Sequence, residues 1–124
     1  MFMIWIKLGS LFMFFGVAFG AFGAHALKNK LSEHYLHVFT TGVLYQLIHA
    51  LGLFVVAWLT TQSSDPKINL AGIFLSAGIV LFSGSLYVLA VTQIKWFGPI
   101  TPVGGVSFLI GWAILFFSYY DHIQ

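Results

Sequence analysis

The segment YQLIHA, which ends just after His49, carries the side chains best suited to chemistry in this chain. Tyr45 and Gln46 precede His49 by four and three positions, so all three share one face of a helix. A buried neutral imidazole needs both a donor and an acceptor as hydrogen-bond partners. We expect Ser83 or Tyr87, from a later apolar segment, to supply one of them. The group is either a hydrogen-bonded core cluster, which we favour, or a site for a ligand, a proton or a metal ion.

Three further histidines lie close together in the sequence. His25 follows the apolar run GAFGA, and we expect it in the lipid headgroup region with nothing specific bound. His34 and His37 have i,i+3 spacing, but this spacing matches no closed zinc signature. At about 1.5 Å per residue, His49 lies about 16 Å deeper than His25, too far for a shared ion. The sequence therefore predicts no metal site and no cofactor.

Thr101 and Pro102, in the stretch FGPITPVGG, are typical of a helix start. Thr101 is the expected N-cap, and Pro102 suits the first turn. The free backbone N–H groups there offer a place for an anion or a lipid phosphate, although a simple capped start is the favoured interpretation. No nucleophile–base pair or metal triad is visible, and FSGSLY lacks the order of a nucleophile elbow. We therefore expect no enzyme.

Composition fixes the class of protein. Of the 124 residues, 60% are hydrophobic and only 6% are charged, whereas soluble domains have about 25% charged residues. A short chain with so few charges is expected to be an integral membrane protein. Its net charge of +2 comes from dispersed lysines, so no nucleic-acid-binding surface is expected. Cysteine is absent, which excludes disulfides.

The elements that position these side chains are predicted to be membrane-spanning helices. A bilayer core is about 30 Å thick and requires about 20 apolar residues per helix. Four segments qualify, and they form one domain. They run over about 2–26, 38–60, 68–92 and 102–120. The first is longer than the apolar region of a typical signal peptide, so we expect it to be a retained helix.

Each predicted helix has one stripe of small or polar residues. In lipid, close backbone approach and interhelical hydrogen bonds drive helices together, and small residues permit the approach. The stripes are therefore expected to meet inside a four-helix bundle. The helix-packing positions are Gly16, Gly20, Gly23, Gly104 and Gly111. Trp112 lies far from the aromatic residues near the helix ends and has to pack against lipid or another helix.

Four ordered motifs resemble those of the domain-of-unknown-function 423 family, small inner-membrane proteins of the YwdK and YgdD type that are similar to transmembrane protein 256 of eukaryotes. The motifs are GAFGAHALK, FTTGVLYQLIHALGLF, LFSGSLYVLA and ITPVGGVSFLIGWAIL. The resemblance implies a four-helix, multi-pass protein of the inner membrane with cytoplasmic termini. It carries no biochemical role for any residue. The lysines are too evenly divided between the two sides to fix an orientation by themselves.

Two functional hypotheses follow. The first is a non-enzymatic structural or accessory component of the membrane, with lipids as its surroundings and the polar stripes used for packing. The second is a carrier, channel or module that binds lipids or small molecules, in which the polar stripe around His49 lines a passage. Four helices enclose little space, so the second hypothesis favours a homo-oligomer. A dry bundle interior supports the first hypothesis, and an open groove that reaches His49 supports the second.

Overall fold

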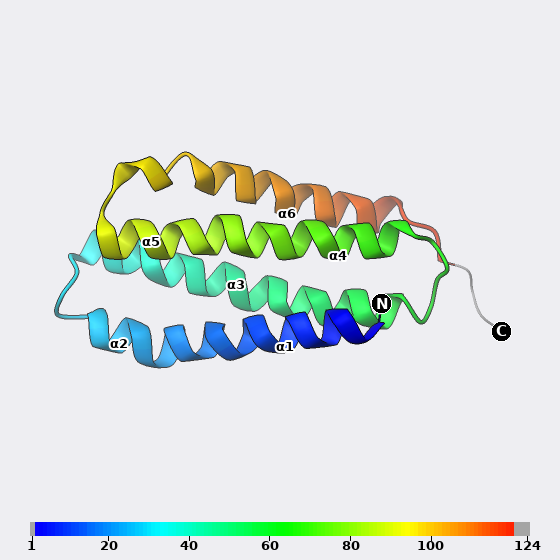
Figure 1. The fold of residues 1–124 in the computed structure, drawn as a ribbon, viewed down its shortest axis with the longest axis horizontal. Helices are drawn as coiled ribbons and strands as arrows, with labels where there is room; N and C mark the ends of the chain where they lie inside the picture. The colour runs from blue at the N-terminus through cyan, green and yellow to red at the C-terminus, as the bar shows by residue number, and fades with distance from the viewer. Residues whose placement is uncertain (1, 121–124) are drawn as a thin grey trace.

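The computed structural model describes residues 2–120 and arranges them in four long helical spans, with no strand among these residues (Figure 1). Each span is long and apolar enough to cross a bilayer. The spans are Phe2–Leu27, Glu33–Leu59, Lys67–Thr92 and Lys95–Phe117. The predicted all-α membrane bundle of four helices is confirmed.

One π-helical turn interrupts each of the first and third spans. In chain order their elements are α1 (Phe2–Ala18), η1 (Phe19–Gly23) and α2 (Ala24–Leu27), then α4 (Lys67–Gly78), η2 (Ile79–Ser83) and α5 (Gly84–Thr92). A π turn inserts an extra residue into the helix. It therefore rotates every later side chain away from the face that a constant 100° per residue predicts.

The second span, α3 (Glu33–Leu59), begins five residues before the expected start at 38. The hydroxyl oxygen of Ser32 accepts a hydrogen bond from the N–H of Tyr35, at 3.2 Å, which satisfies one free donor of the first turn. The carboxylate of Glu33 in that turn is also favourable beside the positive end of the helix dipole. The polar first two turns resemble a loop in the sequence, which explains the difference.

The fourth span begins with a short 3-10 turn, η3 (Lys95–Phe97), and continues as α6 (Ile100–Phe117). Thr101 is the second residue of α6 and does not cap it, so the predicted N-cap is wrong. The helix ends at Phe117, before the expected 120, because Ser118 is extended.

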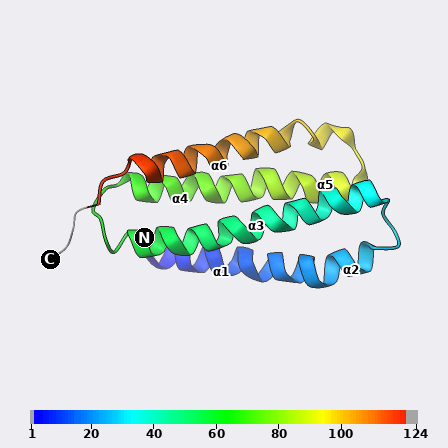
Figure 2. The ribbon, with the colours of Figure 1, turned by 180° about the vertical axis from the view of Figure 1, so that it is seen from behind.

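The spans form a bundle with two central and two outer members. Figures 1 and 2 show α1 and α6 at opposite edges, with α3 and the α4–α5 span between them. α1 packs mainly on α3, and α6 packs mainly on α4 and η2. α1 begins and α6 ends at the same end of the bundle.

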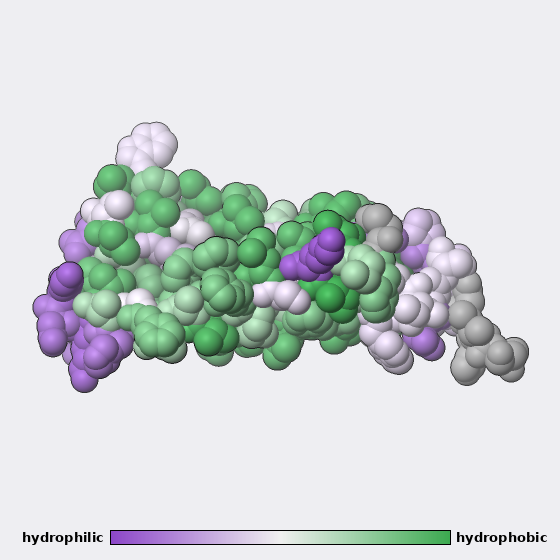
Figure 3. Space-filling view, turned by 60° about the horizontal axis from the view of Figure 1, so that its bottom comes forward, coloured by the Kyte–Doolittle hydropathy of each residue, from purple (hydrophilic) through white to green (hydrophobic). Residues whose placement is uncertain are grey.

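The buried side chains form two clusters along the bundle. The larger one is near the start of α1 and includes Trp5, Leu53, Ile68, Leu75 and Phe108. The smaller one lies toward the other end and contains Phe39, Val43 and Ala90. Outside these clusters, a hydrophobic band lies between two more hydrophilic ends (Figure 3). This surface suits a bilayer with polar headgroups at both ends.

Candidate functional site

His49 lies in the interior of the bundle with both ring nitrogens engaged. Its side chain is only 6% exposed. Nδ1 lies 2.8 Å from the carbonyl oxygen of Tyr45, one turn earlier in α3. The Nε1–H of Trp112 in α6 donates to Nε2 at 3.0 Å. The imidazole also stacks on the ring of Phe108, with centroids 3.6 Å apart.

These two contacts define one tautomer of His49. A carbonyl oxygen can only accept a hydrogen bond, so Nδ1 has to carry the proton that points at Tyr45. An indole N–H can only donate, so Nε2 has to be unprotonated toward Trp112. The ring is thus a neutral imidazole with one donor and one acceptor, and both are used. Neither nitrogen is left to bind a ligand without breaking a bond within the bundle.

The partner of His49 comes from the fourth span, and the expected partners Ser83 and Tyr87 bind elsewhere. Ser83 Oγ donates to the carbonyl oxygen of Gly42 at 2.6 Å, and Tyr87 OH donates to Oε1 of Gln46 at 2.6 Å. Both contacts lie nearer the start of α3 than His49 does. The side chain of His49 points toward α6, and not toward η2 or α5, where Ser83 and Tyr87 lie.

Gln46 connects three spans. Its Nε2 donates to the carbonyl oxygen of Phe12 in α1 at 2.7 Å, while its Oε1 accepts from Tyr87 in α5. Gln46 and His49 were expected to lie together, but they bind different neighbours of α3. Gln46 joins α1 and α5, and His49 joins α6. Tyr45 contributes its carbonyl to His49, and its ring is on the exposed surface against Phe82.

Serine and threonine hydroxyls bridge the other helix contacts. Ser107 Oγ donates to the carbonyl oxygen of Phe74 at 2.7 Å, which joins α6 to α4. Ser85 and Thr101 share a 2.6 Å hydrogen bond between α5 and α6, which gives Thr101 a partner in place of the predicted cap. Such interhelical bonds are a common means of helix association in membranes.

The glycines of the first span lie against α3. A Cβ built on Gly16 would meet Leu47, one on Gly20 would meet Val43 at 2.9 Å, and one on Gly23 would meet Phe39 at 3.2 Å. Small residues at these positions allow α1 and η1 to approach α3 closely. Gly16 and Gly20 have GxxxG spacing, and these contacts place that pair within the bundle.

Gly104 and Gly111 lie where α6 contacts the third span. A Cβ on Gly111 would lie 2.7 Å from a methyl group of Leu75, whereas one on Gly104 would collide with the backbone of Phe82, whose Cα would be 2.7 Å away. A side chain can rotate away, but backbone cannot. Gly104 therefore marks the closest approach of α6 to the π turn η2.

The interfacial histidines do not form a cluster. His25, His34 and His37 are all exposed. Among residues 2–120, no three His, Cys, Asp or Glu side chains come together in a way that could hold a metal ion. His34 instead lies against the ring of Tyr35, with centroids 4.9 Å apart.

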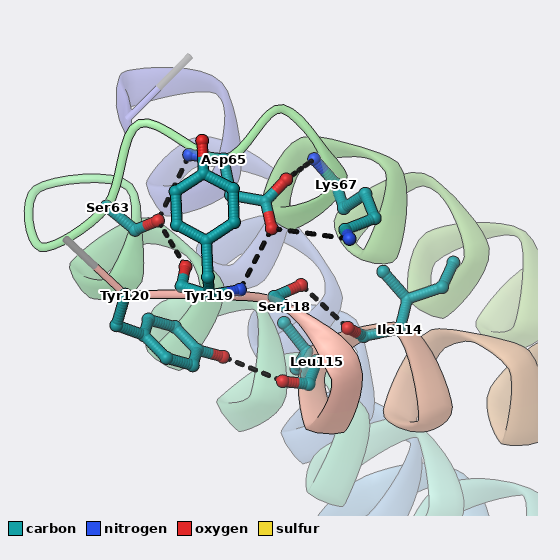
Figure 4. A network of polar contacts seen from close by, with 8 residues as sticks. All are labelled: Ser63, Asp65, Lys67, Ile114, Leu115, Ser118, Tyr119 and Tyr120. Carbon is teal, nitrogen blue, oxygen red and sulfur yellow. Dashed lines mark hydrogen bonds and ion pairs between the residues drawn. The ribbon is translucent and has the colours of Figure 1, made fainter.

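Sequence reasoning missed a buried carboxylate network at the end where the chain begins (Figure 4). Asp65, in the loop before α4, is 3% exposed. Its two oxygens accept the backbone N–H groups of Lys67 and Tyr119, each at 3.0 Å. Ser63 Oγ donates to the carbonyl oxygen of Tyr119 at 2.6 Å. The loop between α3 and α4 is thereby tied to the residues that follow α6.

Opposing effects act on the pKa of the Asp65 carboxyl. Burial raises it, but the hydrogen bonds from Lys67 and Tyr119 and the nearby Lys67 ammonium together lower it below the ordinary 3.8. The Lys67 Nζ lies 3.7 Å from Oδ2. A helix-start signal in SSDPK was visible in the sequence, but the contact with Tyr119 spans 54 positions and has no local signature.

Comparison with known proteins places the chain in a family. Residues 19–105 match the family described as "Protein of unknown function (DUF423)". The chain belongs to the DUF423 family. It is 51% identical over 113 residues to the UPF0382 membrane protein YwdK of Bacillus subtilis, an alignment that covers 90% of this chain and 92% of that protein.

Two staphylococcal membrane proteins are similar to the chain over almost the same length. A UPF0382 membrane protein of Staphylococcus epidermidis is 47% identical over 112 residues, which are 90% of this chain and 91% of that protein. One of Staphylococcus haemolyticus is 44% identical over 120 residues, which are 97% and 98% of the two chains. No solved structure matches the chain significantly.

The DUF423 match contains most of the polar core but not all of its partners. Gln46, His49 and Tyr87 lie within residues 19–105. Phe12 and Trp112, which bind Gln46 and His49, lie outside this range. The signal that could have identified Trp112 is its place in the middle of an apolar helix, where its N–H requires an acceptor.

Proposed function

We propose that this DUF423 protein is a non-enzymatic structural or accessory component of the membrane. The observation that carries the proposal is the hydrogen bonding of His49, whose two nitrogens are both used within the bundle. The deepest ionisable side chain of α3 thus serves to join α3 to α6. Ligand binding would require a ring nitrogen without a partner in the bundle. Proton transfer would require a nearby group that can give a proton to the ring or take one from it.

The remaining polar side chains of the spans support the same proposal. Gln46, Ser83 and Ser107 each bind a group of another helix. Among the residues that the structure describes, Ser76 Oγ is the one buried side-chain oxygen without a hydrogen-bond partner. A polar stripe that is paired in this way holds helices in register, which is the structural role expected of intramembrane hydroxyl and amide groups.

The alternative is an oligomeric carrier or channel that uses the polar stripe. Flux measurements with purified protein in liposomes separate the two. We expect wild-type vesicles to show no saturable flux of protons or ions above protein-free vesicles, and His49→Phe to lower thermal stability. A saturable flux that His49→Phe abolishes without loss of stability would overturn the structural proposal. Native mass spectrometry of the same preparation would report whether copies associate.

We also propose that the protein resides in the inner membrane with cytoplasmic termini. The resemblance of the motifs to the family supports this orientation. With four spans, α1 begins and α6 ends at the same end of the bundle. Reporter fusions at Met1 and Gln124 should both give the cytoplasmic signal. Two periplasmic signals would reverse the orientation, and two different signals would contradict the four-span topology.

A further inference from the structure

The side-chain hydroxyl of Tyr45 has no hydrogen-bond partner among residues 2–120, although the backbone carbonyl of the same residue binds His49. The side chain is 36% exposed, so it lies at the surface of the bundle. Tyr87 in α5 differs, because its hydroxyl donates to Gln46 at 2.6 Å. The hydroxyl of Tyr45 is therefore available to a group outside the bundle.

This hydroxyl belongs to the middle of a membrane span. Tyr45 lies twelve residues after Glu33 and fourteen before Leu59, about 18 Å and 21 Å from the two ends of α3. Phe2 and Tyr120 lie at the end of the bundle where α3 finishes, and the four residues after Tyr120 can span at most about 14 Å. A hydroxyl donor without an acceptor is unfavourable in hydrocarbon. The acceptor therefore has to come from another molecule in the bilayer.

The surroundings of Tyr45 leave room for another helix. Its ring centroid lies 4.5 Å from that of Phe82 and 6.3 Å from that of Phe108. A Cβ built on Gly105 of α6 would lie 3.8 Å from the Phe82 ring, which is an ordinary contact, so packing within the bundle does not require a glycine there. Gly105 is also only partly buried. A small residue at this place lets the backbone of a further span approach closely.

The neighbouring side of α6 carries a stripe with a spacing of four, three and four positions, which places its members on one helix face. They are Gly105, Leu109, Trp112 and Phe116. The N–H of Trp112 reaches His49, so this stripe lies on the side of α6 that is next to α3. Ile48, three residues after Tyr45, is exposed on α3. We call the stripe together with Tyr45 and Ile48 the Tyr45 face.

We propose that the Tyr45 face is the contact surface of a homodimer, in which the two Tyr45 hydroxyls form a hydrogen bond with each other. A hydroxyl both donates and accepts, so Tyr45 of a second copy is a chemical complement to it. Two copies inserted in the same orientation are related by a twofold axis along the membrane normal. Such an axis brings a residue to the same depth as its own counterpart. The oxygens of a lipid lie at the headgroups instead, about 15 Å from the bilayer centre.

The dimer is a further property beyond the structural role proposed above. The hydrogen bonds that join the four helices to one another do not include the Tyr45 hydroxyl. Loss of this hydroxyl should therefore affect association between copies and leave the bundle intact.

Disulfide cross-linking tests the surface, since the chain contains no cysteine of its own. Single-cysteine variants of the full-length protein are reconstituted in liposomes and oxidised. Ile48→Cys, close to Tyr45 on α3, should give cross-linked dimers. Phe14→Cys is the matched control, exposed on α1 at the opposite edge of the bundle from α6, and should give few. Leu109→Cys is a second position in case the sulfur atoms at Ile48 do not meet. If neither variant cross-links more than the control, the Tyr45 face is not a dimer interface.

Tyr45→Phe tests the hydroxyl and keeps the ring. The dimer fraction of fluorescently labelled protein is measured in phosphatidylcholine liposomes as the protein-to-lipid ratio is lowered. The association constant should fall about threefold, the value of an average interhelical hydrogen bond in a membrane. The thermal midpoint of the monomer in detergent should stay unchanged. Tyr87→Phe is the matched control, which should lower the thermal midpoint and leave the association constant unchanged. An unchanged association constant in Tyr45→Phe would overturn the role of the hydroxyl.

Native mass spectrometry distinguishes a second copy from another occupant of the Tyr45 face. Wild type should appear as a dimer. A monomer that retains a lipid-soluble small molecule, which Tyr45→Phe loses, would assign the hydroxyl to a ligand and would overturn the dimer.

Discussion

The indole of Trp112 donates to Nε2 of His49 at 3.0 Å, and this bond joins the middle of α3 to the last third of α6. The terminal ring atoms of Trp112 also fill the space above Gly52, where a Cβ would be only 3.2 Å away. The indole is therefore held by packing on one side and by a hydrogen bond on the other. Together these contacts fix the rotation of α6 relative to α3.

Trp112→Phe should destabilise the protein by about 1–3 kcal/mol, because it leaves Nε2 of His49 buried without a donor. The phenyl ring preserves part of the packing. Thermal unfolding in detergent measures the effect. Phe116→Leu, at a strongly exposed position of α6, is the control and should change little.

The double variant His49→Phe with Trp112→Phe should cost less than the sum of the two single changes. With both polar groups removed, neither is left unpaired. Strict additivity would mean that the 3.0 Å contact contributes nothing to stability.

Gly104→Ala should be among the most damaging small changes in the chain. The added methyl group would meet the backbone of Phe82, and overpacking of this kind costs about 1–3 kcal/mol or more. Gly84→Ala is the matched control, since its methyl group meets nothing within 4 Å. Similar midpoints for the two variants would show that α6 can move away from η2 freely.

The spans were predictable from sequence because bilayer thickness and apolar length are properties of each segment alone. Which stripe contacts which other helix was not predictable from sequence. Helical periodicity correctly put Gln46 and His49 on one face of α3. It could not show that different helices pack against the two residues, with α1 and α5 at Gln46 and α6 at His49. Ser83 lies in the π turn η2, so a constant 100° per residue could not place it reliably.

Stability should fall at acidic pH through Asp65. Its folded-state pKa is below the 3.8 of the unfolded chain, so its contribution is fully present above about pH 5 and is lost as the pH falls through the folded-state value. Thermal unfolding between pH 6 and pH 3 measures this loss. Asp65→Asn should be less stable at pH 6 and should show a flatter profile below pH 5. If the stability of the wild type depended on pH as little as that of the variant, Asp65 would not be the cause of the loss at acidic pH.

Gln93→Gly should stabilise the end of α5. Gln93 has a φ of 59°, in the left-handed region, and its N–H donates to the carbonyl oxygen of Leu89 at 2.7 Å. This conformation costs a residue with a Cβ about 1–2 kcal/mol, and glycine avoids most of that cost. Val91→Gly, inside the helix, should destabilise by about 1 kcal/mol instead. The same sign for both changes would contradict this account.

The network at Asp65 shows why part of the candidate site was not predictable. Hydropathy treats residues 60–66 as a polar loop, which they are. Only the folded chain brings the backbone of Tyr119 to within 3.0 Å of the Asp65 carboxylate. The carboxylate accepts hydrogen bonds from backbone N–H groups, which almost every residue type has. The residue types at these positions therefore do not indicate the contact.

The division of the bundle into closely packed neighbours has a consequence for how the chain assembles. The first and second spans are consecutive and antiparallel, and so are the third and fourth. A short loop joins the two members of each pair, so both pairs can form as helical hairpins soon after insertion. Lipid provides no hydrophobic force to bring the finished hairpins together. The bonds of Gln46 to Tyr87, Gly42 to Ser83 and His49 to Trp112 all cross from one hairpin to the other. We therefore expect these three bonds to form when the two hairpins dock, and to favour the correct docking of the two halves.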